Sequence, residues 1–188
     1  MDTLQAFDRA GAITDGIVGP ITDEQLSLPT PCSDWNVRDV LNHLVLGDLI
    51  VTAFFLGEPQ PDRSADHVGA EPIKALAKSL AATRAELTSP GALERVVEGT
   101  FMGTATVADL AERRIADLVA HLWDLARATG RSTDYDAELV ERVQAHYRAR
   151  LDGKPREGMP IAAISPVPED ATPADRLAGF LGRTVIVS

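Results

Sequence analysis

Two histidines and one aspartate have the residue types and the spacing of a metal site. Asp117 and His121 are four residues apart, so on a helix their side chains lie on successive turns of one flank. A carboxylate oxygen and an imidazole nitrogen placed in this way can bind one ion at about 2.0 to 2.2 Å from each. His43, at the edge of the apolar stripe of an earlier helix, is the candidate third ligand. Nitrogen donors favour zinc, iron, nickel or manganese over calcium.

Three protein ligands would leave one coordination position open for water or a substrate, whereas a structural zinc site is usually closed by four. Explanations without a metal stay open at this stage. His43 could be a hydrogen-bonded histidine between helices, and Asp117 could form only a local hydrogen bond with His121. Asp124 lies on the same flank. It is either an acceptor for an imidazole N–H, or a solvated charge or loop cap, and the sequence leaves open whether it touches the ion.

Four other side chains have less specific interpretations. Asp48 falls in the apolar stripe of its helix, where an unpaired carboxylate is costly, so we expect it to have a partner or to lie at a rim. Cys32 is the only cysteine, which excludes an intramolecular disulfide and a zinc site built mainly from cysteines. We expect it to be a buried or half-buried thiol. Trp35 and Trp123 are interpreted as packing anchors.

The elements that must position these residues are helices, because helical periodicity and cap signals dominate and alternating strand patterns are almost absent. The sequence predicts an all-α fold in a single domain, 1–188. The expected helices cover residues 4–18, 37–56, 71–87, 107–128, 135–151 and 173–182. Residues 93–103 are ambiguous between a short extended segment and a cover for one end of the bundle. The proline-rich stretch 155–168 is expected to be an ordered cover or a lid.

Composition limits the classes of partner. Eighteen Lys and Arg against twenty-eight Asp and Glu give a formal charge of -10, and such a surface repels nucleic acid. The apolar run up to Leu56 is interrupted by Gly47 and Asp48, so no membrane span is expected. The first residues carry an acid and lack the apolar stretch of a signal peptide. We therefore expect a cytoplasmic protein with no membrane partner.

Three parts of the sequence resemble a known family. They are TPCSDWNVRDV at 30–40 with NHLV at 42–45, DLVAHLWDLARATG at 117–130, and PVPEDATPADRL at 166–177 with FLGR at 180–183. These runs resemble the DinB-like superfamily, specifically its actinobacterial metal-binding branch related to mycothiol-dependent maleylpyruvate isomerase.

The resemblance implies a fold and a site. The fold would be an up-and-down four-helix bundle with additional short helices and a long C-terminal covering loop. One divalent ion, zinc before nickel, iron or manganese, would be held by His43, Asp117 and His121. The family isomerase has Glu where this chain has Asp117, so the shorter side chain must come closer to the ion. The resemblance also points to a homodimer.

For function, the resemblance implies a metalloenzyme that activates a small-molecule thiol, with mycothiol as cosubstrate, for transfer, addition or isomerisation. Because the separate C-terminal domain of the isomerase is lacking, maleylpyruvate itself is not the expected substrate. Hydrolysis through a metal-bound water is a related reaction. The alternatives are a metal-binding or sensing module without turnover, and a bundle that binds no metal.

Overall fold

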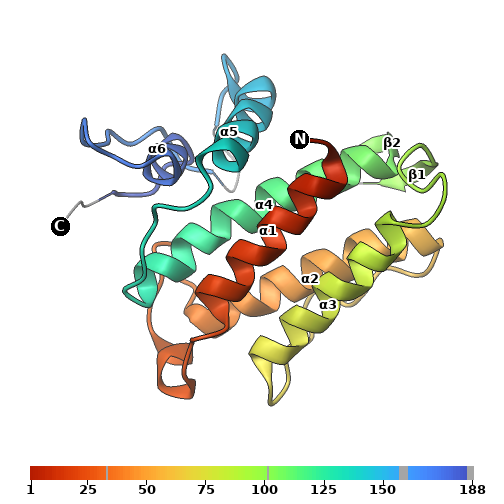
Figure 1. Ribbon diagram of the computed structural model, residues 1–188, viewed down its shortest axis with the longest axis horizontal. Coiled ribbons are helices and arrows are strands. Elements are labelled where there is room, and N and C mark those ends of the chain that lie inside the picture. Colours follow the sequence, from red (N-terminus) through yellow and green to blue (C-terminus); the bar gives the residue numbers. More distant parts are fainter. Residues whose placement is uncertain (33, 101, 157–160, 186–188) are drawn as a thin grey trace.

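In the residues that the structure describes, the chain forms six α-helices, one short 3₁₀ turn and one small hairpin (Figure 1). The computed structural model describes residues 1–32, 34–100, 102–156 and 161–185. The elements are α1 (Thr3–Val18), the 3₁₀ turn η1 (Asp23–Ser27), α2 (Val37–Leu56), α3 (Pro72–Leu87), β1 (Val96–Thr100), β2 (Gly103–Thr106), α4 (Val107–Ala128), α5 (Ala137–Leu151) and α6 (Pro173–Phe180). The predicted all-α class is confirmed.

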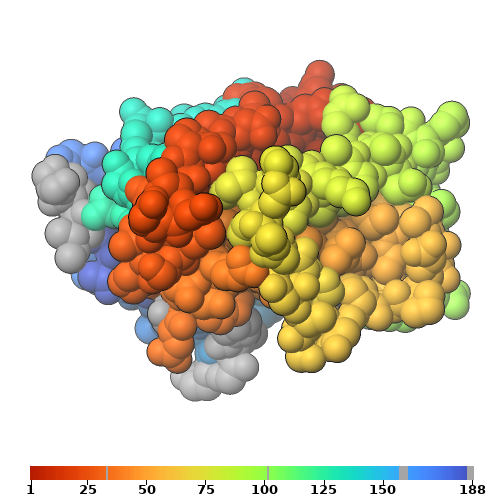
Figure 2. Space-filling view, turned by 90° about the horizontal axis from the view of Figure 1, so that it is seen from below, coloured from red at the N-terminus to blue at the C-terminus, as the bar shows by residue number. Residues whose placement is uncertain are grey.

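Helices α1 to α4 form the four-helix bundle that the family resemblance implies. Helix α1 packs against α3 and α4, and α2 packs against the same two helices, so each helix has two neighbours in a closed ring. On the face shown in Figure 2, the yellow residues of α3 lie against the red and orange residues of α1 and α2. Helices α5 and α6 contact each other and lie against α4, on one side of the bundle (Figure 1).

Helices α2 and α3 run in the same direction, so the bundle departs at this pair from the up-and-down order that the resemblance implies. Ser79 contacts Asp48, and Thr83 contacts Thr52. The second contact lies four residues further along each helix than the first, so the two helices are parallel. Residues 57–71 must therefore return along the bundle before α3 begins. Helix α4 runs the opposite way to α2, which brings its middle turns beside the first half of α2.

Helix α2 carries the first histidine of the candidate site. Asn36 caps it: the Asn36 side chain accepts from the amide of Asp39, and the Asp39 carboxylate accepts from the amide of Asn36. Gly57, with φ of 70°, ends it. By length and composition alone α2 is apolar enough to cross a membrane, although Gly47 and Asp48 were expected to interrupt the run. Half of this stretch is buried, as in the core helix of a bundle.

Helix α4 carries the other two candidate ligands. Its first turn is closed by a reciprocal pair between Thr106 and Asp109. The preceding stretch, ambiguous in the sequence, forms an antiparallel hairpin in which Val96 pairs with Thr106. The hairpin runs directly into α4, so it fixes the start of the helix.

The element boundaries differ little from those predicted. Helix α5 starts two residues later than expected, because Asp136 is its N-cap. Helix α6 ends at Phe180 instead of Gly182. The turn η1 was not predicted. Residues 157–160 of the expected cover lie outside the described residues. Within the described part, the Ser165 amide donates to the Gly179 carbonyl at 2.9 Å, so this stretch does pack on α6.

The buried apolar cluster contains residues of all six helices. Its largest fully buried side chains come mainly from α2 and α4, so the two helices that carry the candidate ligands are also the centre of the core. That the whole chain is one domain, and that it forms a homodimer, stay predictions.

Candidate metal centre

The structure brings His43, Asp117 and His121 together. Asp117 Oδ1 lies 3.2 Å from His43 Nε2 and 3.8 Å from His121 Nε2. One ligand atom from each residue lies within 4.8 Å of the other two. Asp117 and His121 lie one turn apart on α4, and the antiparallel α2 supplies His43 from across the interface. The carboxylate oxygen thus faces two imidazole nitrogens.

These atoms fit a tetrahedral transition-metal ion. With bonds of about 2.1 Å, neighbouring ligand atoms in a tetrahedral zinc site are roughly 3.4 Å apart, close to both distances from Asp117 Oδ1. The His43 and Asp117 side chains are each 32% exposed, whereas that of His121 is 10% exposed. The cluster is therefore reached from solvent on the side of His43 and Asp117, where a further ligand could enter.

Asp124 fixes the orientation of His121. Its Oδ2 lies 2.9 Å from His121 Nδ1. Because an ionised carboxylate only accepts hydrogen bonds, Nδ1 must carry the proton. The lone pair of the neutral ring then lies on Nε2, the atom that faces Asp117. A carboxylate behind a histidine in this way is the usual support of a metal-binding imidazole.

Arg114 holds the other oxygen of Asp117. Its Nη1 donates to Asp117 Oδ2 at 3.1 Å, its Nε to Asp48 Oδ1 at 2.6 Å, and its Nη2 to the Leu44 carbonyl at 2.8 Å. Asp48 Oδ2 also accepts from the Ser79 hydroxyl at 2.7 Å. The expectation that Asp48 has a partner is confirmed, and the partner is Arg114. The network leaves Oδ1 as the oxygen of Asp117 that is directed at the histidines.

The electrostatics keep Asp117 ionised. Burial favours its neutral form, but the hydrogen bond with His43, the charges that both imidazoles carry when they are protonated, and the charge of Arg114 hold the pKa of Asp117 well below its usual range. Asp117 is therefore ionised at neutral pH, and the ionised carboxylate is the form that binds a cation.

Cys32 lies beside the cluster without the properties of a ligand thiolate. Burial raises its pKa, the Asp124 charge adds to that effect, and Arg183 opposes it. Cys32, His121 and Asp124 also have ligand atoms within 4.8 Å of one another. However, Arg183 already places its positive charge there: its Nη2 is 4.0 Å from the Cys32 sulfur. The predicted half-buried thiol agrees with the intermediate exposure of Cys32.

Trp35 forms one side of the cluster. Its ring centroid lies 4.9 Å from that of His43 and 5.9 Å from that of His121. Its expected role in packing thus extends to the candidate ligands themselves. Trp123 is a buried anchor, and its Nε1 donates to Asp175 at 2.7 Å.

Sequence reasoning did not identify Arg114 or Arg183. Arg114 had a signal that could have found it, since it lies three residues before Asp117 on the same helix and Asp48 needed a buried cation. Arg183 lies 59 residues from Asp124 in an irregular segment, and no periodicity connects them.

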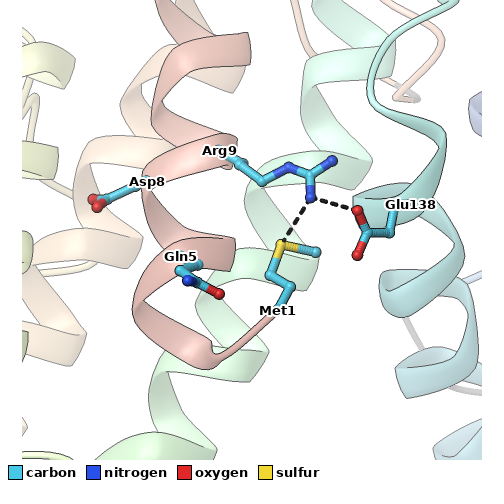
Figure 3. Close-up of a pocket in the computed structure, with 5 residues that line it drawn as sticks. All are labelled: Met1, Gln5, Asp8, Arg9 and Glu138. Carbon is cyan, nitrogen blue, oxygen red and sulfur yellow. Dashed lines mark hydrogen bonds and ion pairs between the residues drawn. The ribbon is translucent and has the colours of Figure 1, made fainter.

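A separate surface hollow lies between α1 and α5 (Figure 3). It is lined by Met1, Gln5, Asp8, Arg9 and Glu138. Arg9 Nη1 donates to Glu138 at 2.7 Å and lies 3.4 Å from the Met1 sulfur, and Arg9 also pairs with Asp136. The charge of Arg9 is thus compensated within the protein, and the hollow contains none of the clustered histidines.

A four-helix bundle with two histidines and a carboxylate between α2 and α4 is a DinB-like architecture. The sequence model of the mycothiol maleylpyruvate isomerase N-terminal domain matches residues 7–126, and the chain belongs to this family. It is 33% identical to an uncharacterized protein of Mycobacterium tuberculosis strain CDC 1551 / Oshkosh, over 98% of this chain and 100% of that protein. The same figures hold for an uncharacterized protein of strain ATCC 25618 / H37Rv. No solved structure matches the chain.

Proposed function

We propose that the protein binds one divalent metal ion, zinc in the first place, through His43, Asp117 and His121, and that it is a thiol-dependent metalloenzyme. The observation that carries the proposal is the convergence of three donor atoms from α2 and α4, with Asp117 Oδ1 facing both Nε2 atoms. When bound, such an ion supplies a Lewis acid that lowers the pKa of a coordinated thiol or water.

The surrounding residues have defined roles in this proposal. Asp117 contributes a negative charge that burial would otherwise suppress, and Arg114 directs its Oδ1 to the ion. Asp124 keeps the Nε2 lone pair of His121 available. Cys32 stays protonated and leaves the open position to a ligand from solution. Trp35 covers the two imidazoles on one side and limits the access of water.

Mycothiol is the proposed cosubstrate, because the family whose sequence model matches the chain is that of the mycothiol maleylpyruvate isomerase N-terminal domain. The reaction would be thiol transfer, addition or isomerisation. A cytoplasmic location would suit this chemistry, since low-molecular-weight thiols stay reduced there. Binding at the open position would need the partly exposed side formed by His43 and Asp117.

The test is the metal content of purified protein after reconstitution with zinc, measured by inductively coupled plasma mass spectrometry. Wild type should hold about one equivalent, and His43→Ala and His121→Ala should lose it. His67→Ala is the matched control, because His67 lies outside the cluster and bonds the Asp62 carbonyl. Wild type that stays metal-free after reconstitution would contradict the proposal and leave a metal-free bundle.

A second measurement separates a centre that binds a thiol, as the proposed enzyme must, from a metal-binding module without thiol chemistry. Cobalt-substituted protein is titrated with mycothiol while the near-ultraviolet and visible absorption spectrum is recorded. A new sulfur-to-cobalt band that is absent from His121→Ala supports thiol binding at the open position. Stoichiometric cobalt whose spectrum does not respond to mycothiol would favour the module without thiol chemistry.

A further inference from the structure

Arg183 reaches the candidate centre from a part of the chain that follows α6, beyond the residues 7–126 that match the family. Its Nη2 lies 2.9 Å from Asp124 Oδ2 and its Nε lies 3.2 Å from Asp124 Oδ1. The Arg183 side chain is 12% exposed and that of Asp124 is fully buried. This is a two-point contact between a guanidinium and a carboxylate in the protein interior.

The contact fixes how Asp124 supports His121. Asp124 Oδ2 accepts from both Arg183 Nη2 and His121 Nδ1, each at 2.9 Å. A carboxylate held at both oxygens by a planar guanidinium cannot rotate freely. Its Oδ2 therefore stays in line with Nδ1, and the His121 ring is held with Nε2 toward Asp117 and His43. Arg183 also neutralises the Asp124 charge behind the ring.

Hydrogen bonds on both sides of α6 hold the C-terminal segment in the position that places the Arg183 guanidinium beside Asp124. Asp175, near the start of α6, accepts from Trp123 of α4 at 2.7 Å and from the Thr133 hydroxyl at 3.0 Å. After the helix, the Arg183 amide donates to the Ala178 carbonyl at 2.9 Å. The segment is thus anchored to α4 twice, through Trp123 at the start of α6 and through Asp124 beyond its end.

We propose that Arg183 is a positioning residue for the metal centre, acting through Asp124 on His121, and that docking of the C-terminal segment is coupled to metal binding. The inference rests on the proposed function. The coupling is reciprocal: by whatever factor docked Arg183 raises the metal affinity, a bound metal raises the stability of docking by the same factor. The C-terminal segment thereby completes a site whose ligands all lie within residues 7–126.

The main test is the zinc affinity of the full chain, measured by competition with a chromophoric chelator. Arg183→Met should bind zinc about 10 to 100 times more weakly, the usual effect of removing a residue that supports a ligand. Arg183→Lys keeps the charge but loses the two-point contact, so it should fall between Arg183→Met and wild type. Arg176→Met is the matched control, because Arg176 is exposed on α6 and bonds the Ala171 carbonyl. It should bind like wild type.

Amide hydrogen exchange measures the other half of the coupling. Zinc should slow exchange over residues 173–183 in wild type and in Arg176→Met, and should have little effect there in Arg183→Met. Equal zinc affinity in Arg183→Met and wild type, or zinc-independent exchange of this segment in wild type, would overturn the inference while leaving the three-ligand site intact. If Arg183→Met does not fold, the same two readouts on Arg183→Lys decide the question.

A third readout is independent of metal. Nitrogen NMR of the imidazoles in metal-free protein reports which ring atom of His121 carries the proton. Wild type should show the proton on Nδ1, and Arg183→Met should lose this single form. If wild type bound no zinc but the His121 tautomer depended on Arg183, the proposed function and the coupling to metal would fail, and the positioning of His121 by Arg183 would stand. An unchanged tautomer in Arg183→Met would refute that role.

Discussion

Asp48 of α2 and Arg114 of α4 form an ion pair in the core, with 2.6 Å between Asp48 Oδ1 and Arg114 Nε. The two side chains are 1% and 2% exposed. Burial alone would lower the pKa of Arg114, but the charge and hydrogen bond of Asp48 raise it above its usual value. The same guanidinium also donates a hydrogen bond to Asp117. The ion pair therefore connects the packing of two core helices with the geometry of the candidate centre.

Arg114→Met should destabilise the protein by about 3 to 5 kcal/mol, because Asp48 would then be a buried charge without its cation. The free energy of unfolding in urea, measured on metal-free protein, checks this value. Adding Asp48→Asn to Arg114→Met removes the stranded charge and should recover part of the loss. A double variant as unstable as the sum of the two single variants would contradict the importance of the pair.

Asp117→Asn should weaken zinc binding at least about tenfold, since even residues behind a ligand typically contribute that much and a neutral amide is a poorer ligand than a carboxylate. The size of the side chain is unchanged, so the fold should survive. Isothermal titration with zinc measures the affinity. Asp134→Asn, an exposed change of the same type, is the control. Equal affinities of the two variants would remove Asp117 from the ligand set.

Asp175 should make stability depend on acid pH. Burial favours its neutral form, but hydrogen bonds from Trp123, Thr172 and Thr133 hold the pKa of Asp175 below its usual value. A folded-state pKa below the unfolded value of about 3.9 gives stability that is fully present above that value and is lost as the pH falls through the folded pKa.

Asp175→Asn should therefore cost about 1.5 to 3 kcal/mol at pH 7, the range for hydrogen bonds to a charged group, and less near pH 3. Urea unfolding of wild type and variant at both pH values gives the difference, and Trp123 fluorescence can report it. A difference that stays constant between the two pH values would show that the Asp175 charge contributes nothing.

Gly179→Ala should loosen the cover over α6. A Cβ at Gly179 would lie 2.3 Å from Val167 Cγ1 and 3.1 Å from the Ser165 carbonyl oxygen, so the 161–168 stretch must move. Such overpacking typically costs about 1 to 3 kcal/mol. Gly16→Ala on α1 meets nothing within 4 Å and should stabilise by about 0.5 to 1 kcal/mol. Relative to wild type, the free energy of unfolding should fall in Gly179→Ala and rise in Gly16→Ala, and a stabilised Gly179→Ala would contradict the packing.

Features that depend on residues close together in the sequence could be predicted from it. Caps such as Asn36 with Asp39 and Thr106 with Asp109 placed the starts of α2 and α4, because each pair is three residues apart and its partners are backbone amides. The flank shared by Asp117 and His121 follows from helix geometry alone. The turn η1 was missed because a single turn of 3₁₀ helix carries no periodicity.

Long-range contacts were beyond sequence reasoning. The helical wheel indicated that Asp48 needed a partner but could not select Arg114, which lies 66 residues away. The same holds for the parallel course of α2 and α3, since the composition of the 57–71 loop does not give its path. The role of Arg183 could not be predicted either, because its contact with Asp124 depends on how the irregular segment after α6 packs against α4.

The separation of His43 from Asp117 has a consequence for how the protein is made on the ribosome. The two residues are 74 positions apart, which corresponds to about 4 to 15 s of synthesis at about 5 to 20 residues per second. During that interval the face of α2 that α4 later covers, including the Asp48 carboxylate, has no native partner in the nascent chain. The proposed metal ion could therefore be held by all three ligands only after α4 has emerged.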